Sequence, residues 1–252
     1  MAVTIPLAID IENMGFQYPG NTEVSFTNLS LKVAKGSRFG LFGPNGAGKT
    51  TLISLMTGLL TANEGHIKLL GHEMGRQNVN SINKLFGFVP QDFSFYQEMS
   101  PVENLDFFGA WAGLDKKTIK HRTDELLNIL GLESVRNKQV LKFSGGMKRR
   151  VNLAIGVIHN PEIIFLDEPT VGVDVQTGHA IITYLRELNK NGTTLIYTSH
   201  QLSEAEDLCQ QVALIDAGKI IAQDSLDTLL KDHCQETLEH LFLNLTGKDY
   251  RN

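Results

Sequence analysis

The sequence has few of the features that mark several large classes of protein. Cysteine occurs only at positions 209 and 234 of 252 residues, which suits neither a disulfide framework nor a cysteine-rich zinc site and favours a reducing compartment. No apolar run approaches the roughly 18 residues needed to cross a membrane. The opening residues, MAVTIPLAIDIEN, lack the charged and apolar regions of a signal peptide. The sequence therefore predicts a protein that acts without crossing a membrane.

Basic residues are not in excess either. The chain has 23 Lys and Arg against 28 Asp and Glu, for a net charge of −5. This balance does not favour strong non-specific binding to nucleic acid, so we expect no nucleic-acid partner. Hydrophobic residues make up 42% of the chain, enough for a sizeable core in one large domain.

The order of apolar patterns predicts an α/β fold. Short apolar strands are expected at 37–43, 162–167 and 193–200, and residues 48–60 carry apolar residues at helical spacing. Residues 9–33 have strand-like segments broken by turn residues. Strands alternating with helices indicate a largely parallel sheet, into which a mainly helical stretch, about 101–160, is inserted. The tail, about 225–252, is expected to be helical and polar.

A glycine-rich stretch, GPNGAGKTT, lies between a predicted strand and a predicted helix. It fits the pattern G-x-x-x-x-G-K-[ST], in which glycines let backbone N–H groups approach phosphate oxygens. Lys49 is expected to reach the β- and γ-phosphates, and Thr50 to place its hydroxyl on Mg²⁺. A flexible turn with a solvated lysine is the alternative, which the flanking strand and helix disfavour. The expected phosphate-binding residues are Gly43, Asn45, Gly46, Gly48, Lys49, Thr50 and Thr51.

Two acids follow the apolar strand in IIFLDEPT. Side chains at the carboxyl ends of parallel strands face the crevice where ligands bind. We expect Asp167 to hold Mg²⁺ and Glu168 to orient or deprotonate the attacking water. His200 ends the next apolar strand and is expected at the same crevice. Solvated acids and a structural histidine are the alternatives.

A third motif is FSGGMKRR, at the start of a predicted helix. A serine followed by bare backbone amides at a helix N-terminus can bind an anion. Because a phosphate loop is already present, Ser144, Gly145 and Gly146 are either a structural cap or a site for a nucleotide held by another subunit. The basic run 148–150 is interpreted as a solvated helix face without a substrate role.

The phosphate loop, the SGG helix start, LDEPT and TSH, in that order, resemble the ATP-binding subunits of ABC transporters. The resemblance covers essentially the whole chain, from FQYPG to LFLNLTGKD. It implies a P-loop NTPase with a RecA-like core sheet, an N-terminal antiparallel β subdomain and an inserted α-helical subdomain. It implies one ATPase domain over 1–252, with the core and β subdomain at about 1–91 and 161–224, the helical subdomain at 92–160 and the tail at 225–252.

The resemblance also implies roles for single residues. Tyr18 matches the aromatic residue that stacks on adenine, although Phe16 is a rival and Tyr18 is alternatively a core residue. Gln91 matches the glutamine that contacts Mg²⁺ and the attacking water. Asp174 matches the aspartate of a loop that communicates across a dimer. The residues that match the segment contacting ATP on the opposite subunit are Ser144, Gly145, Gly146 and Met147.

Two departures from the family pattern concern packing. Phe143 stands where leucine is usual before SGG, and Val171 and Val173 stand in the loop TVGVD where alanine or serine and leucine are usual. The substitutions keep apolar character, so they bring local packing into question more than the ATPase chemistry.

The resemblance implies a mechanism and partners. Two copies would align head to tail around two ATP molecules with Mg²⁺, Lys49 of one subunit and Ser144 of the other contacting each γ-phosphate. The subunit would lie on the cytoplasmic face of the inner or plasma membrane. A separate membrane permease would dock near residues 92–105, where Phe93, Phe95 and Tyr96 are expected to be exposed; the alternative is that these rings pack inside the helical subdomain.

The short C-terminal tail favours export over import. It resembles the tails of exporter ATPases of the drug, polysaccharide or haem-export type. The alternatives are an importer subunit and a non-transport ABC ATPase acting on nucleic acid or ribosomes. The sequence does not indicate the transported substrate, the membrane partner, or whether the dimer is formed by identical chains.

Overall fold

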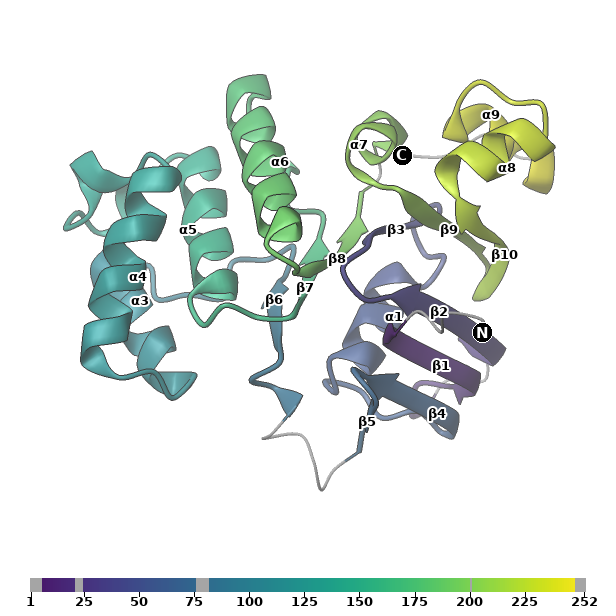
Figure 1. Cartoon of the computed structure of the whole chain (residues 1–252), viewed down its shortest axis with the longest axis horizontal. Helices are drawn as coiled ribbons and strands as arrows, with labels where there is room; N and C mark the ends of the chain where they lie inside the picture. The colour runs from purple at the N-terminus through teal and green to yellow at the C-terminus, as the bar shows by residue number, and fades with distance from the viewer. Residues whose placement is uncertain (1–5, 21–24, 76–81, 200, 248–252) are drawn as a thin grey trace.

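Two β-sheets and two groups of helices make up the fold of the computed structural model, which describes residues 6–20, 25–75, 82–199 and 201–247. His200 lies outside the described residues, so its expected role stays a prediction. Figure 1 shows the helical part on the left, the parallel strands in the middle and the antiparallel sheet at the lower right. The arrangement is the α/β P-loop NTPase fold that the sequence predicts.

The central sheet has six strands in the order β10-β9-β3-β8-β7-β6. Every pair is parallel except β10 with β9. All residues of β7 and β8 are buried, as expected for apolar strands covered on both faces. The strands span Arg38–Phe42 (β3), Phe86–Val89 (β6), Ile163–Asp167 (β7), Thr194–Thr198 (β8), Gln211–Asp216 (β9) and Lys219–Ser225 (β10).

The smaller sheet is antiparallel, with the order β2-β1-β4-β5. Its strands span Leu7–Phe16 (β1), Phe26–Ala34 (β2), Glu64–Leu69 (β4) and His72–Glu73 (β5). Buried side chains such as Ile9 and Leu31 share one apolar core with Leu52 of helix α1, Lys49–Met56, and with β3. This core fixes α1 between the two sheets.

Helices α3, Pro101–Trp111, α4, Lys116–Ile129, and α5, Gly145–Val157, form the helical part inserted between β6 and β7 (Figure 1). Two short 3₁₀ turns, Glu133–Val135 and Val140–Lys142, join α4 to α5. Ser100 and Glu103 form a reciprocal capping box at the start of α3, which satisfies two otherwise unpaired N–H groups.

The remaining helices follow the core strands. They span Val175–Lys190 (α6), Leu202–Leu208 (α7), Leu226–Asp232 (α8) and Leu238–Thr246 (α9). The prediction of a polar tail is wrong for α9, because Leu238, Leu241 and Phe242 are buried in the main core. Glu206 of α7 accepts the backbone N–H of Leu238 at 2.6 Å, which fixes the start of α9 on α7.

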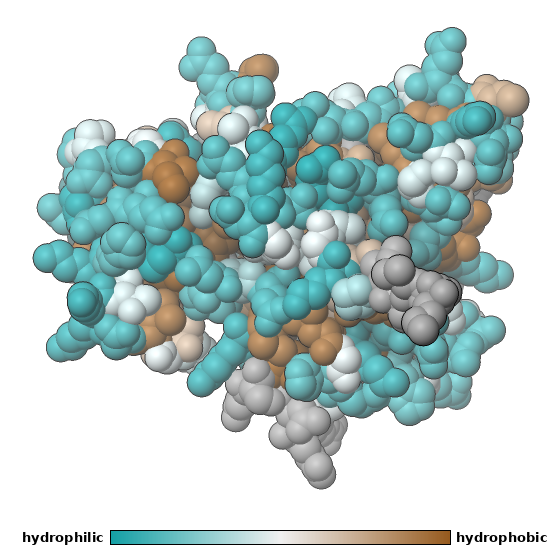
Figure 2. All heavy atoms as spheres, viewed as in Figure 1, coloured by the Kyte–Doolittle hydropathy of each residue, from teal (hydrophilic) through white to brown (hydrophobic). Residues whose placement is uncertain are grey.

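The surface seen in Figure 2 is mostly hydrophilic, with hydrophobic side chains in small separate groups. Among the described residues, none of the helices combines the length and apolar character needed to span a bilayer.

Helix α5 and strand β6 pack at backbone distance. A Cβ added to Gly87 would lie 2.0 Å from the carbonyl oxygen of Gly156, and one added to Gly156 would lie 2.5 Å from Cγ2 of Val89. Only glycine fits on either side of this contact.

We expect Gly87→Ala to lower the free energy of unfolding by about 1–3 kcal/mol, because the methyl group has to push α5 off the sheet. Gly75→Ala is the matched control, since its added Cβ meets nothing within 4 Å. Thermal unfolding followed by circular dichroism measures both variants. Equal melting temperatures for Gly87→Ala and Gly75→Ala would show that α5 and β6 can accommodate the methyl group without loss of stability.

Candidate functional site

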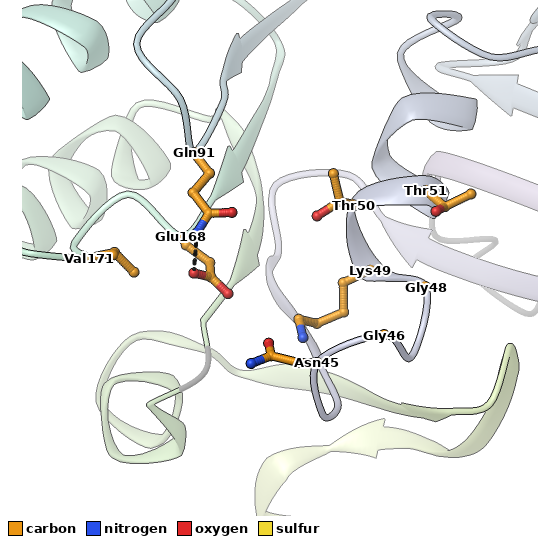
Figure 3. Close-up of a pocket in the computed structure, with 9 residues that line it drawn as sticks. All are labelled: Asn45, Gly46, Gly48, Lys49, Thr50, Thr51, Gln91, Glu168 and Val171. Atoms are coloured by element: carbon orange, nitrogen blue, oxygen red, sulfur yellow. Dashed lines mark hydrogen bonds between the residues drawn. The ribbon is translucent and has the colours of Figure 1, made fainter. Parts of the chain in front are cut away.

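A cavity of about 440 Å³ lies at the carboxyl ends of the parallel strands. The phosphate loop follows β3, Glu168 follows β7, and Gln91 lies just beyond β6. Figure 3 shows the loop and the start of α1 on one side, with Gln91 and Glu168 on the other. The lining residues are Asn45, Gly46, Gly48, Lys49, Thr50, Thr51, Gln91, Glu168 and Val171.

The loop conformation depends on its glycines. Gly46 has φ of 82° and Gly48 has φ of 108°, a region that residues with a side chain avoid. A Cβ on Gly48 would also come within 2.8 Å of the Phe26 ring. Gly48 is the N-cap residue of α1 and no side chain caps this helix, so its first N–H groups are available to an anion.

Lys49 begins α1 and is only 7% exposed. Its Nζ donates to the carbonyl oxygens of Gly43 at 2.7 Å and Pro44 at 3.2 Å. Burial lowers the pKa of Lys49, while the nearby charges of Glu168 and Asp167 oppose this shift. The ammonium group therefore lies where the loop and the two acids meet.

Asp167 is 2% exposed and accepts two hydroxyl hydrogen bonds. Thr50 donates through Oγ1 to Oδ2 at 3.0 Å, and Thr198 donates through Oγ1 to Oδ1 at 2.7 Å. The Thr50 hydroxyl and the Asp167 carboxylate thus bring together oxygen ligands of the kind that Mg²⁺ prefers. Within the described part of the chain, no group of three or more His, Cys, Asp and Glu side chains forms a ready metal site.

Glu168 is 8% exposed and has φ of 51°. Its backbone N–H donates to the carbonyl oxygen of Thr198 at 3.2 Å and to Thr198 Oγ1 at 3.1 Å. Nε2 of Gln91 donates to Glu168 Oε2 at 3.1 Å (Figure 3). The structure therefore brings together two of the three side chains predicted to act in hydrolysis.

Tyr18 does not line the cavity. Its hydroxyl lies 2.9 Å from Oγ1 of Thr51, a lining residue, and its ring meets Phe16 edge to face at 4.9 Å. Phe16 is 4% exposed and belongs to the core of the antiparallel sheet. Of the two candidates for stacking on adenine, only Tyr18 keeps an accessible ring, and its role stays a prediction.

The predicted SGG segment is also outside the cavity. Ser144 is the N-cap residue of α5 and accepts the N–H of Met147 at 3.3 Å. Gly146 packs against Thr177, since an added Cβ would lie 3.2 Å from that side chain. The segment therefore lies beside the start of α6.

Asp174 caps α6. It accepts the N–H of Thr177 at 3.0 Å and its hydroxyl at 2.8 Å, and these hydrogen bonds lower the pKa of Asp174. The starts of α5 and α6 thus form one exposed edge that carries both Ser144 and Asp174.

Comparison with known proteins places the fold and the motifs in one family. Residues 26–171, more than half of the chain, match the family described as "ABC transporter". The chain belongs to the ABC transporter family. Because the phosphate loop and both acids are in place, it is an ATP-binding and ATP-hydrolysing subunit of that family.

Similar ABC proteins span several named systems. The chain is 41% identical over 214 residues to the linearmycin resistance ATP-binding protein LnrL of Bacillus subtilis, covering 85% of this chain and 68% of that protein. It is 37% identical over 231 residues to the Nod factor export ATP-binding protein I of Rhizobium sp., covering 91% and 75%. A cassette solved as a dimer bound to ADP and Pi is 24% identical, with a TM-score of 0.79 over 86% of this chain and 98% of that one.

The interpretation of 148–150 as a solvated face is wrong for Arg149, which is 8% exposed. Its Nη1 donates to the carbonyl oxygen of Gln91, its Nε donates to that of Val171 at 3.3 Å, and its guanidinium lies 4.8 Å from the ring centre of Phe93. Burial lowers the pKa of Arg149. Arg149 therefore links two segments that line the ATP site of this ABC subunit to α5.

Arg149 was obscured by its two basic neighbours. Its spacing, three residues after Gly146 and three before Asn152, puts it on the buried face of α5, and that spacing was the available signal. Arg150 is also bonded, through Nη1 to the carbonyl oxygen of Leu130 at 2.9 Å.

The two departures from the ABC pattern are accommodated by packing. Phe143 is 8% exposed and belongs to the main apolar core. Val171 lines the cavity and Val173 is half-buried. The larger Phe143 and Val171 and the smaller Val173 are therefore accommodated with Glu168 still lining the cavity.

Proposed function

We propose that two copies of this subunit close head to tail around two ATP molecules. One observation carries the proposal: the cavity contains the phosphate loop and Glu168, while Ser144 to Met147 lie on another edge of the same chain. A helix start of this kind suits a phosphate, and a second copy supplies it to the first cavity. Light scattering with and without ATP and Mg²⁺ tests the proposal; a chain that stays monomeric under all ATP conditions contradicts it.

In each site the nucleotide phosphates lie on the loop 43–51, and Lys49 neutralises the β- and γ-phosphates. Thr50, Asp167 and Gln91 would hold Mg²⁺, which would supply charge neutralisation at the phosphates. The adjacent oxygens of Thr50 and Asp167 support this assignment. The ring of Tyr18 stacks on adenine, and Asp174 acts at the interface between the subunits.

Glu168 is the general base or water-orienting residue of hydrolysis. Its carboxylate faces the cavity and accepts a hydrogen bond from Gln91 (Figure 3), so a water bound to the carboxylate would lie on the side of the phosphate loop. For His200, which lies outside the described residues, we propose a role as donor to the γ-phosphate or in positioning the water. A positioned general base contributes about 10²–10⁴-fold to such a reaction.

ATP-driven closure and reopening of the dimer drive conformational changes in a separate transmembrane permease. We propose that the permease docks near residues 92–105, at a cavity of about 380 Å³ between β6, α3 and α5 that Ser94 and Trp111 help to line. Phe93 and Phe95 are half-buried, and Phe95 packs against the main apolar core. Tyr96 is 45% exposed and Trp111 is 81% exposed. An exposed tryptophan beside an apolar cavity is typical of a protein-binding surface.

Replacing Trp111 with aspartate is expected to abolish co-purification with the membrane partner, because a charge is placed at the rim of the apolar cavity. Ile129→Asp is the matched control, since Ile129 is a 44% exposed apolar residue on α4. ATP hydrolysis by the isolated subunit should be unchanged in both. Retention of the membrane partner by Trp111→Asp would place the docking surface elsewhere.

The direction of transport is export, with the subunit on the cytoplasmic face of the membrane. Support comes from the relative named for Nod factor export and from the linearmycin resistance relative. Transport of a labelled compound in inside-out vesicles containing the permease tests the direction. ATP-dependent loss of compound from the vesicle lumen would instead establish import.

A further inference from the structure

One carboxylate outside the cavity gathers three buried hydroxyl groups. Oε2 of Glu204, on α7, accepts hydrogen bonds from Thr170 Oγ1 at 2.6 Å, Tyr197 Oη at 2.7 Å and Ser199 Oγ at 3.3 Å. Thr170 is 6% exposed, Tyr197 0% and Ser199 1%. Thr170 lies in the loop after β7, Tyr197 lies on β8 and Ser199 follows β8 directly, so a single oxygen on α7 joins the loop after β7 to β8.

The hydrogen bonds to Glu204 all run in one direction, from the hydroxyl groups to the carboxylate. An ionised carboxylate only accepts hydrogen bonds, so each hydroxyl has to donate to it. Such charge-assisted bonds are shorter and stronger than neutral ones. Burial, and then the charge of Glu204, raise the pKa of Tyr197 well above its ordinary range, which keeps the phenol protonated as a donor.

We propose that Glu204 is a positioning residue for hydrolysis, which holds the segment after Glu168 in place. The inference rests on the proposed role of Glu168. Thr170 is two residues beyond Glu168, and Pro169 between them has no N–H group. The Thr170–Glu204 hydrogen bond is therefore a side-chain anchor on the far side of Glu168, beside the contacts of Thr170 with Tyr197 Oη at 3.2 Å and of Val171 with Arg149.

Glu168 needs anchors on both sides. With φ of 51°, it is in the left-handed region, which a residue with a side chain keeps only when its surroundings hold it there. On the near side, Thr198 accepts the Glu168 N–H through its carbonyl oxygen and its hydroxyl. On the far side, Glu204 holds Thr170.

The same carboxylate also holds Ser199, the residue directly after β8, against α7. Both β8 and α7 are labelled in Figure 1. Ser199 Oγ donates to Glu204 and accepts the N–H of Gln201 at 2.9 Å. Helix α7 thus sets the position of Thr170 relative to β8, the strand that holds the backbone of Glu168.

The expected result for Glu204→Ala is a fall in kcat of about 10- to 100-fold, because small displacements of a catalytic group have effects of this size. The KM for ATP should stay within about twofold, since Glu204 does not line the cavity. Glu204→Gln keeps an accepting oxygen and should retain more activity. Asp207→Ala is the matched control on α7, because its pairing with Arg186 is exposed and contributes little.

Thr170→Val keeps the proposal testable if Glu204→Ala does not fold, because it removes only the hydroxyl after Glu168. The double variant Thr170→Val with Glu204→Gln should lower kcat by little more than the more damaging of the two single substitutions. This non-additivity is expected when two residues are partners in one interaction. Circular dichroism corrects every rate for the folded fraction. The inference would be overturned if folded Glu204→Ala had the same kcat as the control Asp207→Ala. If Glu204→Ala does not fold, the same comparison is made with Thr170→Val.

Glu168→Gln, measured beside these variants, separates the two ideas. If Glu168→Gln is inactive while the Glu204 and Thr170 variants are fully active, only the positioning role of Glu204 fails. If Glu168→Gln is itself fully active, the proposed role of Glu168 fails, and the positioning inference fails with it.

Discussion

Glu168→Gln is expected to lower ATP hydrolysis by about 10²–10⁴-fold while ATP binding is kept, because an amide cannot take the proton of the attacking water. The glutamine has nearly the same shape, so the contact with Gln91 and the phosphate loop on the opposite wall are retained. ATP is then bound without turnover, and the closed dimer should accumulate. Phosphate release measures the rate, and light scattering with ATP and Mg²⁺ measures the dimer.

The control for this variant is Glu162→Gln, at the other end of β7. Glu162 pairs with Lys35 at 2.7 Å on the surface, away from the cavity. Its rate should equal that of the wild type, because exposed pairs of this kind contribute little. Hydrolysis by Glu168→Gln at the same rate would remove Glu168 from the reaction.

Mixing two inactive variants should restore activity if each site is built by two subunits. Lys49→Ala damages the phosphate loop, and Ser144→Arg blocks the helix start that faces the partner. In a mixed head-to-tail dimer, one site contains both changes and the other contains neither. Random pairing therefore predicts recovery of up to about a quarter of the wild-type rate, while each variant alone stays inactive.

A second mixture supplies the control. Lys49 and Glu168 line one cavity of one chain, so mixing Lys49→Ala with Glu168→Gln leaves every site with one defect. This mixture should recover nothing. Recovery in neither mixture, or equal recovery in both, would contradict the assignment of Ser144 to the partner's site. Nucleotide binding by monomeric Ser144→Arg, followed by fluorescence, shows that its own cavity is intact.

The residues that sequence alone placed well are those fixed by local geometry. Gly43 to Thr51 and Asp167 follow apolar strands, and the carboxyl ends of parallel strands meet at one edge of a sheet. The phosphate loop, Glu168 and Gln91 accordingly line one cavity. The order of strands and helices predicted this for the loop and Glu168, because their positions depend on chain connectivity, while Gln91 was expected from the family resemblance alone.

The residues that sequence did not place depend on contacts between distant segments. Arg149 is buried because Gln91, more than fifty positions earlier, supplies a carbonyl oxygen. Glu204 gathers Thr170 from another strand end. Trp111 is exposed although tryptophan favours burial. Local periodicity could indicate that Arg149 faces the core, but it does not identify the distant partners of Arg149 and Glu204, which are set by the tertiary fold.

Two of the three acids on helix α7 contact different parts of the molecule. Glu204 binds the loop after β7, while Glu206, two residues on, accepts the N–H that starts α9. Opening α9 locally therefore removes a support from the helix that orders the catalytic loop. We therefore expect the C-terminal helices and the hydrolytic edge of the sheet to unfold as one cooperative unit. A substitution in α9 is then expected to change the rate of ATP hydrolysis, although α9 does not line the nucleotide cavity.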